Sequence, residues 1–225
     1  MVICDNPAFL FIHVPKAAGT SVTGALAHLD LFRAAKRKKD LAERKKWIAA
    51  KGFNHAVLDL PIHASAKHAR DVIGEENFTS LYKFAIVRNP WDMELSWYSY
   101  NAQTESAPHY REATTYRDFG DYVKRHLSEH GRLLAPGPQT KYVMDGAGNS
   151  IVDRILRYEN LAADFASVID HLEIDGVILD QFNQSYHVPW PEAYTPETFT
   201  LAREWLQSDI EAFGYSDDPE SYGIK

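Results

Sequence analysis

The pattern of apolar and polar positions along the chain predicts strands that are followed by helices. Residues 9–14 form a nearly unbroken apolar run, interrupted only by His13, and such a run is typical of a strand covered by helices on both faces. Apolar residues then recur at helical spacing from Val22 to Leu29, after a loop of small and hydroxyl-bearing residues. The beginning of the chain therefore predicts the order strand, loop, helix.

Further elements are expected before the middle of the chain. Residues 53–59 read as a short strand or an extended lead, and a helix is expected from about His63 to Ile73, where a glycine follows. The apolar run 82–87 predicts a second strand. A helix should follow it, with Asn89 as its cap and a proline in its first turn.

The second half of the chain predicts mainly helices. An amphipathic helix is expected over 116–130, a hairpin over 142–151, a strand that runs into a helix from 154, and a last helix between the cap Thr195 and the stop Gly214. Strands and helices in this order predict an α/β fold, a single domain with a central parallel sheet flanked by helices. Its active site is expected at the carboxyl ends of the strands.

Composition narrows the class of protein. Hydrophobic residues make up 45% of the 225 residues, so the chain can form a sizeable core. A net charge of -7 gives no general attraction for nucleic acid. The single cysteine, Cys4, cannot form an internal disulfide, and no stretch approaches the roughly 18 apolar residues of a membrane span. Since no signal peptide is recognisable either, we expect a cytoplasmic protein.

One segment departs from this acidic balance. Between residues 33 and 51, lysine and arginine far outnumber aspartate and glutamate. We interpret the segment as a solvated helix or loop with Leu41, Trp47 and Ile48 facing inward. An acidic acceptor, a membrane surface and nucleic acid remain alternative partners for it.

The loop after the first strand carries the first candidate chemistry. Its sequence is Pro15-Lys16-Ala17-Ala18-Gly19-Thr20-Ser21, and the helix that begins there directs backbone N–H groups toward one spot. It is not a Walker A sequence, because Lys16 precedes Gly19 instead of directly following the second glycine. The loop closely resembles the 5′-phosphosulfate-binding loop of sulfotransferases that use 3′-phosphoadenosine 5′-phosphosulfate (PAPS).

A second motif lies where the second strand ends. Arg88 follows the strand, and Ser96 stands two turns into the next helix, so a guanidinium and a hydroxyl can reach the same phosphate. This spacing resembles the 3′-phosphate signature of the same sulfotransferases. Residues 139–172 resemble the carbohydrate-type members, with an Arg-aromatic-Glu-Asn-Leu strand. Met93 and the segment 183–185 depart from the family, where arginine often stands at or just after these positions.

The resemblance implies an enzyme that transfers a sulfuryl group from PAPS to an acceptor hydroxyl, with a carbohydrate as the expected acceptor. A transferring sulfuryl group carries less negative charge than a phosphoryl group, so a lysine and backbone N–H groups can neutralise it, and we expect no metal. Lys16 is expected to serve the chemical step as well as binding. The residues assigned to PAPS are Lys16, Ala18, Gly19, Thr20, Ser21, Arg88 and Ser96.

His63 is the predicted general base. It lies between the two motifs at the expected start of a helix, and it resembles the histidine of a His-x-x-Ala element that is catalytic in this group of sulfotransferases. A neutral imidazole can remove the proton of an attacking hydroxyl, and we expect the helix start to lower the pKa of His63 and keep its ring neutral. His55 is the competing histidine, and a carboxylate or no base at all remains open. We interpret His13 as a core residue and place His68 beyond the first turn of the helix.

Other interpretations stay open at this point. A P-loop kinase or NTPase would use Asp180 for magnesium, and a protein that has lost catalysis would only bind PAPS or its product. His126 and His130 lie one turn apart on the helix expected over 116–130. Such a pair can bind a metal, but no third ligand is recognisable, and we interpret the two histidines as part of an exposed face.

Overall fold

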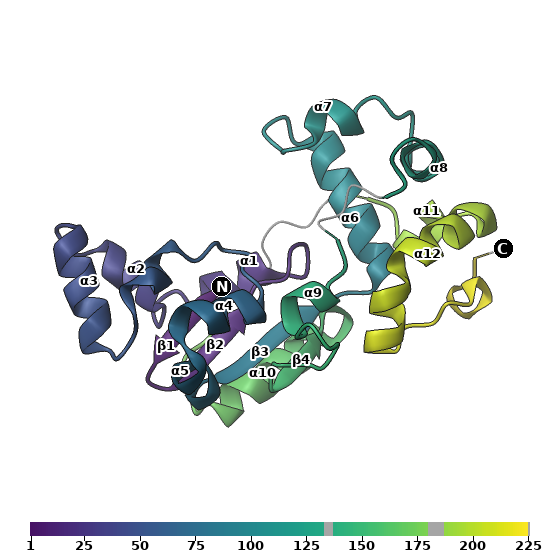
Figure 1. The fold of residues 1–225 in the computed structure, drawn as a ribbon. Helices are drawn as coiled ribbons and strands as arrows, with labels where there is room; N and C mark the ends of the chain where they lie inside the picture. Colours follow the sequence, from purple (N-terminus) through teal and green to yellow (C-terminus); the bar gives the residue numbers. More distant parts are fainter. Residues whose placement is uncertain (133–136, 180–186, 225) are drawn as a thin grey trace. The chain divides into compact units, whose positions relative to one another are not determined.

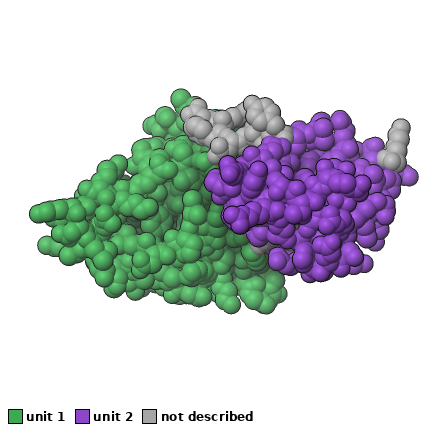
Figure 2. All heavy atoms as spheres, turned by 90° about the horizontal axis from the view of Figure 1, so that it is seen from above, with its two compact units in different colours: residues 1–87, 141–182 green, residues 88–140, 183–225 purple. Residues whose placement is uncertain are grey.

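A computed structural model describes residues 1–132, 137–179 and 187–224. The chain folds into two compact units, of which the first comprises residues 1–87 and 141–182 and the second residues 88–140 and 183–225 (Figure 2). The first unit contains a sheet with helices and confirms the α/β class. The interpretation of the whole chain as one domain stays a prediction.

The first unit is built on a four-stranded, mostly parallel sheet in the order β1-β2-β3-β4. Its central strands β2 and β3 are parallel, with Ile12 beside Ala85, and β3 is parallel to β4. The sheet is mixed, because the additional strand β1 runs antiparallel to β2. This strand was not expected from the sequence. The strand bounds are Val2–Asp5 for β1, Ala8–Ile12 for β2, Tyr82–Val87 for β3 and Arg154–Arg157 for β4.

Helices flank this sheet (Figure 1). The core between them contains three fully buried aromatic residues, Phe9, Phe11 and Phe84. The rings of Phe9 and Phe11 are tilted against that of Phe84, with centroids 6.0 and 5.1 Å from it. The helices are α1 (Gly19–Ala25), α2 (Leu31–Lys36), α3 (Leu41–Ala50), η1 (His55–Asp59), α4 (Ala66–Ile73), α5 (Glu75–Ser80), η2 (Tyr158–Asn160) and α10 (Leu161–His171). A short helix, α9 (Thr140–Val143), lies where the chain returns to this unit.

Two predictions in the segment before β3 were wrong. Of residues 53–59, His55–Asp59 form the 3₁₀ helix η1 and not a strand, because the Asn54 side chain accepts a hydrogen bond from the N–H of Ala56 and caps a helical turn. Helix α4 begins at Ala66, since Ser65 caps it by accepting from the N–H of His68. His63 therefore lies in the loop before the helix and not at its start.

Other local predictions were partly correct. In the basic segment Ile48 is buried as expected, but Leu41 is 56% exposed. The hairpin expected over 142–151 contains a single antiparallel bridge, between Met144 and Ser150. The Asp145 carboxylate accepts two backbone N–H groups inside this turn, so the chain closes a tight loop before two strands can pair.

Helices make up the described part of the second unit. Asn89 caps α6 by accepting from two backbone N–H groups, and α12 runs from a capping box at Thr195 to Gly214, as predicted. The helices pack around an aromatic core in which the rings of Trp91 and Phe199 stack 4.3 Å apart. Their bounds are α6 (Pro90–Gln103), α7 (Tyr110–Ala113), α8 (Phe119–His130), α11 (Trp190–Ala193), α12 (Pro196–Phe213) and η3 (Pro219–Tyr222). Among the described residues of either unit, no helix is long and apolar enough to cross a membrane.

Candidate functional site

The loop between β2 and α1 has an unusual backbone. Lys16 and Ala18 both adopt left-handed conformations, with φ of 60° and 58°, which non-glycine residues rarely do. Left-handed residues within a turn are typical of backbone nests, whose successive N–H groups bind anions. Lys16 is half-buried, Ser21 is buried and Thr20 is exposed. The loop thus combines an anion-binding type of backbone with a cationic side chain.

Gly19 is required where α1 begins, because the ring of His13 occupies the space next to it. A Cβ atom on Gly19 would lie 1.8 Å from Cδ2 and 2.0 Å from Nε2 of His13. A buried ring packed on both sides cannot move away without disturbing its neighbours. The glycine is therefore the residue that lets the loop pass over the end of β2.

Gly19→Ala should lower the free energy of unfolding by about 1 to 3 kcal/mol, since the added methyl group overpacks the buried His13 ring. Gly146→Ala is the matched control, because a Cβ atom there has no neighbour within 4 Å. Urea denaturation of both variants measures the difference. Equal stability of the two variants would show that the His13 ring moves aside at little cost.

His63 is oriented by the end of β2. Its Nδ1 lies 3.0 Å from the carbonyl oxygen of His13, and because a carbonyl can only accept, Nδ1 carries the proton and donates. The Nε2 atom of His63 is then the nitrogen with a free lone pair when the ring is neutral. Burial lowers the pKa of His63, an effect that the bond to the His13 carbonyl opposes. The ring is therefore neutral near pH 7, as a general base must be.

His13 supports this arrangement from inside the core. Its ring is buried and lies edge-on to that of His63, with centroids 4.5 Å apart. Burial, with a smaller effect from the N-terminal ammonium group, lowers the pKa of His13 to about 2. Its Nδ1 has no hydrogen-bond partner among the described residues. The interpretation of His13 as a core residue is confirmed, but its contacts with His63 and Gly19 were not foreseen.

The expected reason for a neutral His63 was wrong. Since α4 begins at Ala66, no helix start lowers the pKa of His63, and burial is the main cause. His63 is exposed at the surface, as are the competing histidine, His55, in η1 and His68 on α4. The contact with the His13 carbonyl, and not exposure, distinguishes His63 from the other two. The first unit therefore brings together Gly19, His13 and His63.

Arg88 and Ser96 belong to the second unit. Arg88 is buried, and its Nε donates to the Asp92 carboxylate at 2.7 Å. Ser96 is also buried, on the same helix α6, and so is Met93. The pairing of Arg88 with Asp92 orients the guanidinium along the first turn of α6.

A glutamine that the sequence did not reveal fixes the backbone of Arg88. The Gln139 side chain accepts from the Arg88 N–H at 2.9 Å and donates to the Arg88 carbonyl at 2.8 Å. Asp209 on α12 in turn accepts from the backbone N–H groups of Gln139 and Thr140, at 2.8 and 3.0 Å. Burial raises the pKa of Asp209, while these hydrogen bonds act in the opposite direction. Residues far apart in sequence thus set the position from which α6 begins.

Some predicted positions cannot be placed. Asp180 and the segment 183–185 lie outside the described residues. Of the remaining predicted site residues, Lys16 and Ala18 lie in the β2–α1 loop, and Gly19, Thr20 and Ser21 form the first turn of α1.

The chain was compared with known proteins at three levels. A family model described as "Sulfotransferase family" matches residues 1–216, which include both predicted nucleotide motifs and His63. No curated protein matches the chain, and no solved structure does.

Proposed function

Because this chain belongs to the sulfotransferase family, we propose that it transfers the sulfuryl group of PAPS to a hydroxyl group of a carbohydrate or glycoconjugate. Membership of the family supports the transfer of a sulfuryl group. PAPS as the donor is supported by the two nucleotide motifs, and the carbohydrate acceptor by the resemblance of residues 139–172 to carbohydrate-type members. A cytoplasmic location stays a prediction from the sequence.

The β2–α1 loop is the observation that best supports PAPS as the donor. Its left-handed residues Lys16 and Ala18 give the backbone of an anion-binding nest, and the Lys16 ammonium adds a positive charge to it. We assign the 5′-phosphosulfate to this loop and the first turn of α1, through Lys16, Ala18, Gly19, Thr20 and Ser21. The 3′-phosphate is assigned to Arg88 and Ser96 on the basis of the motif and of the buried, oriented guanidinium.

In the proposed reaction, Nε2 of His63 accepts the proton of the acceptor hydroxyl as its oxygen attacks the sulfur. A new S–O bond forms on the acceptor while the S–O bond to the 5′-phosphate breaks in line with it. The bonding electrons pass to the phosphate oxygen, where the Lys16 ammonium stabilises the developing negative charge. Adenosine 3′,5′-bisphosphate leaves. We propose that this step uses no metal, since the transferred group carries little charge to neutralise.

Arg88→Ala should erase most of the preference for adenosine 3′,5′-bisphosphate over adenosine 5′-monophosphate. A charge-assisted contact contributes about 1.5 to 3 kcal/mol, so the affinity ratio should fall by about one to two decades. Calorimetric titration of both nucleotides measures the ratio. Arg88→Lys keeps the charge beside Asp92 without the planar fork and should give an intermediate value. Equal weakening of both nucleotides would assign Arg88 a purely structural role.

Turnover of PAPS against a panel of hydroxylated acceptors tests the proposed function. The expected result is the release of adenosine 3′,5′-bisphosphate together with a sulfated carbohydrate. Hydrolysis of ATP with magnesium, and no consumption of PAPS, would favour the kinase or NTPase alternative. Tight binding of the bisphosphate without turnover of any acceptor would favour a protein that has lost catalysis.

A further inference from the structure

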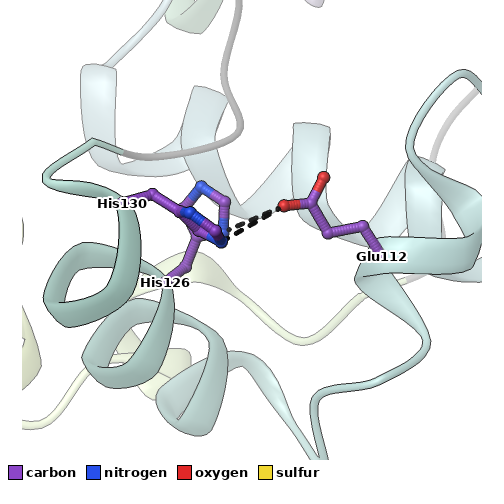
Figure 3. A group of neighbouring side chains, drawn as sticks. All are labelled: Glu112, His126 and His130. Atoms are coloured by element: carbon purple, nitrogen blue, oxygen red, sulfur yellow. Dashed lines mark ion pairs between the residues drawn. The ribbon is translucent and has the colours of Figure 1, made fainter.

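We propose that Glu112, His126 and His130, in the second unit, form a binding site for a divalent transition-metal ion, with zinc as the best match. The site would be additional to the sulfuryl-transfer site and does not depend on the function proposed above. Glu112 belongs to α7, and both histidines lie one turn apart on α8. Figure 3 shows the two imidazole rings side by side, facing the carboxylate.

The separations between the three side chains match a shared ion better than direct hydrogen bonds. Oε1 of Glu112 lies 3.5 Å from Nδ1 of His126 and 3.7 Å from Nε2 of His130, which is too long for good hydrogen bonds. All three ligand atoms lie within 4.8 Å of one another. Zinc bonds of about 2.0 to 2.1 Å place tetrahedral ligands roughly 3.3 Å apart. A small inward movement therefore completes three ligand positions.

His126 distinguishes this group from an ordinary cluster of surface side chains, because its own side chain is completely buried, with 0% exposed. Nδ1 of His126, the atom that faces Glu112, also lies 2.9 Å from the Tyr116 hydroxyl, so an ion bound to Nδ1 would replace this contact. The other ring nitrogen, Nε2, has no hydrogen-bond partner among the described residues. The interpretation of both histidines as an exposed face was thus wrong for His126.

The carboxylate is held by a second contact. Nδ1 of His109 lies 3.3 Å from Oε2 of Glu112, and this pairing leaves Oε1 directed toward His126 and His130. Contacts of this kind commonly orient the ligands of metal sites. Glu112 was missed in the sequence because it precedes the histidines by a loop and not by helical spacing.

The ligand set determines the class of ion. Two imidazoles and one carboxylate suit zinc and similar first-row metals, whereas magnesium and calcium prefer oxygen ligands alone. Three protein ligands leave the fourth position for water or a further group. A bound ion would connect α7 to α8 and should stabilise the second unit against unfolding.

Calorimetric titration of the tag-free protein with zinc chloride tests the site. We expect one ion per chain and at least about a 10²-fold loss of affinity in His130→Gln, which removes a ligand. His130 is suitable because its side chain is 44% exposed, so the variant should fold. His68→Gln, an exposed histidine of the first unit, is the matched control and should bind zinc as the unmodified protein does. Bound cobalt should give the intense visible absorption of a tetrahedral site.

The alternative is that the Glu112 carboxylate only forms ion pairs with protonated histidines and that the cluster binds no metal. In that case zinc binding is absent, or is equal in His130→Gln and the unmodified protein, and either result would overturn the proposal. If His130→Gln melts at a lower temperature than the metal-free protein, Glu112→Gln replaces it with the same expected loss of affinity. Zinc should raise the melting temperature of the unmodified protein and of His68→Gln but not that of the ligand variants.

Discussion

Replacing His63 with alanine is expected to lower kcat about 10²- to 10⁴-fold and to leave the affinity for adenosine 3′,5′-bisphosphate nearly unchanged. The His13 carbonyl fixes the proton of His63 on Nδ1, so the variant loses an oriented Nε2 that accepts the acceptor's proton. Steady-state kinetics with PAPS, combined with calorimetry of the bisphosphate, separates the two quantities. His68→Ala, in the same unit, is the control and should be nearly as active as the unmodified enzyme.

The same variant makes a prediction for the pH profile. A base must be unprotonated, and burial lowers the pKa of His63 below its ordinary value of 6.5. Activity should therefore persist below pH 6.5 and fall only as the pH passes through the lowered pKa, and His63→Ala should lose this acidic limb. Turnover of His63→Ala near that of the unmodified enzyme would transfer the role to His55. Loss of bisphosphate binding in proportion to kcat would show that His63 is structural.

Lys16→Ala should lower kcat about 10²- to 10³-fold, which is the usual cost of removing one group that stabilises developing charge. The loss of product affinity should be smaller, because the ammonium group interacts most strongly when the S–O bond breaks. Single-turnover kinetics and bisphosphate titration measure the two effects. Lys67→Ala, an exposed lysine of α4, is the control for a lost charge. A change in KM alone would identify Lys16 as a residue that binds substrate and transition state equally.

The sequence was sufficient for elements that depend on local signals. The strands β2 and β3 follow from apolar runs, and the beginnings of α6 and α12 follow from Asn89 and Thr195, whose side chains cap those helices. A short strand such as β1 has too few residues for a periodic pattern, and it gains its stability from pairing with β2.

Contacts between distant residues explain most of what the sequence did not reveal. The His13–His63 pair and the Gln139–Asp209 network join residues 50 and 70 positions apart, and neither has a local signal. The start of α4 was misplaced because of a local ambiguity and not a distant contact. The capping residue Ser65 lies only two residues after His63, so both positions were possible helix starts. The sequence therefore identified candidate site residues, but it did not identify the residues that orient them.

Calorimetric titration of nucleotides, with and without magnesium, is a direct test of PAPS as the donor, because it needs no knowledge of the acceptor. We expect adenosine 3′,5′-bisphosphate to bind about 10- to 100-fold more tightly than adenosine 5′-monophosphate, and we expect magnesium to change neither affinity. A preference for ATP in the presence of magnesium, with the bisphosphate binding no better than the monophosphate, would contradict this expectation.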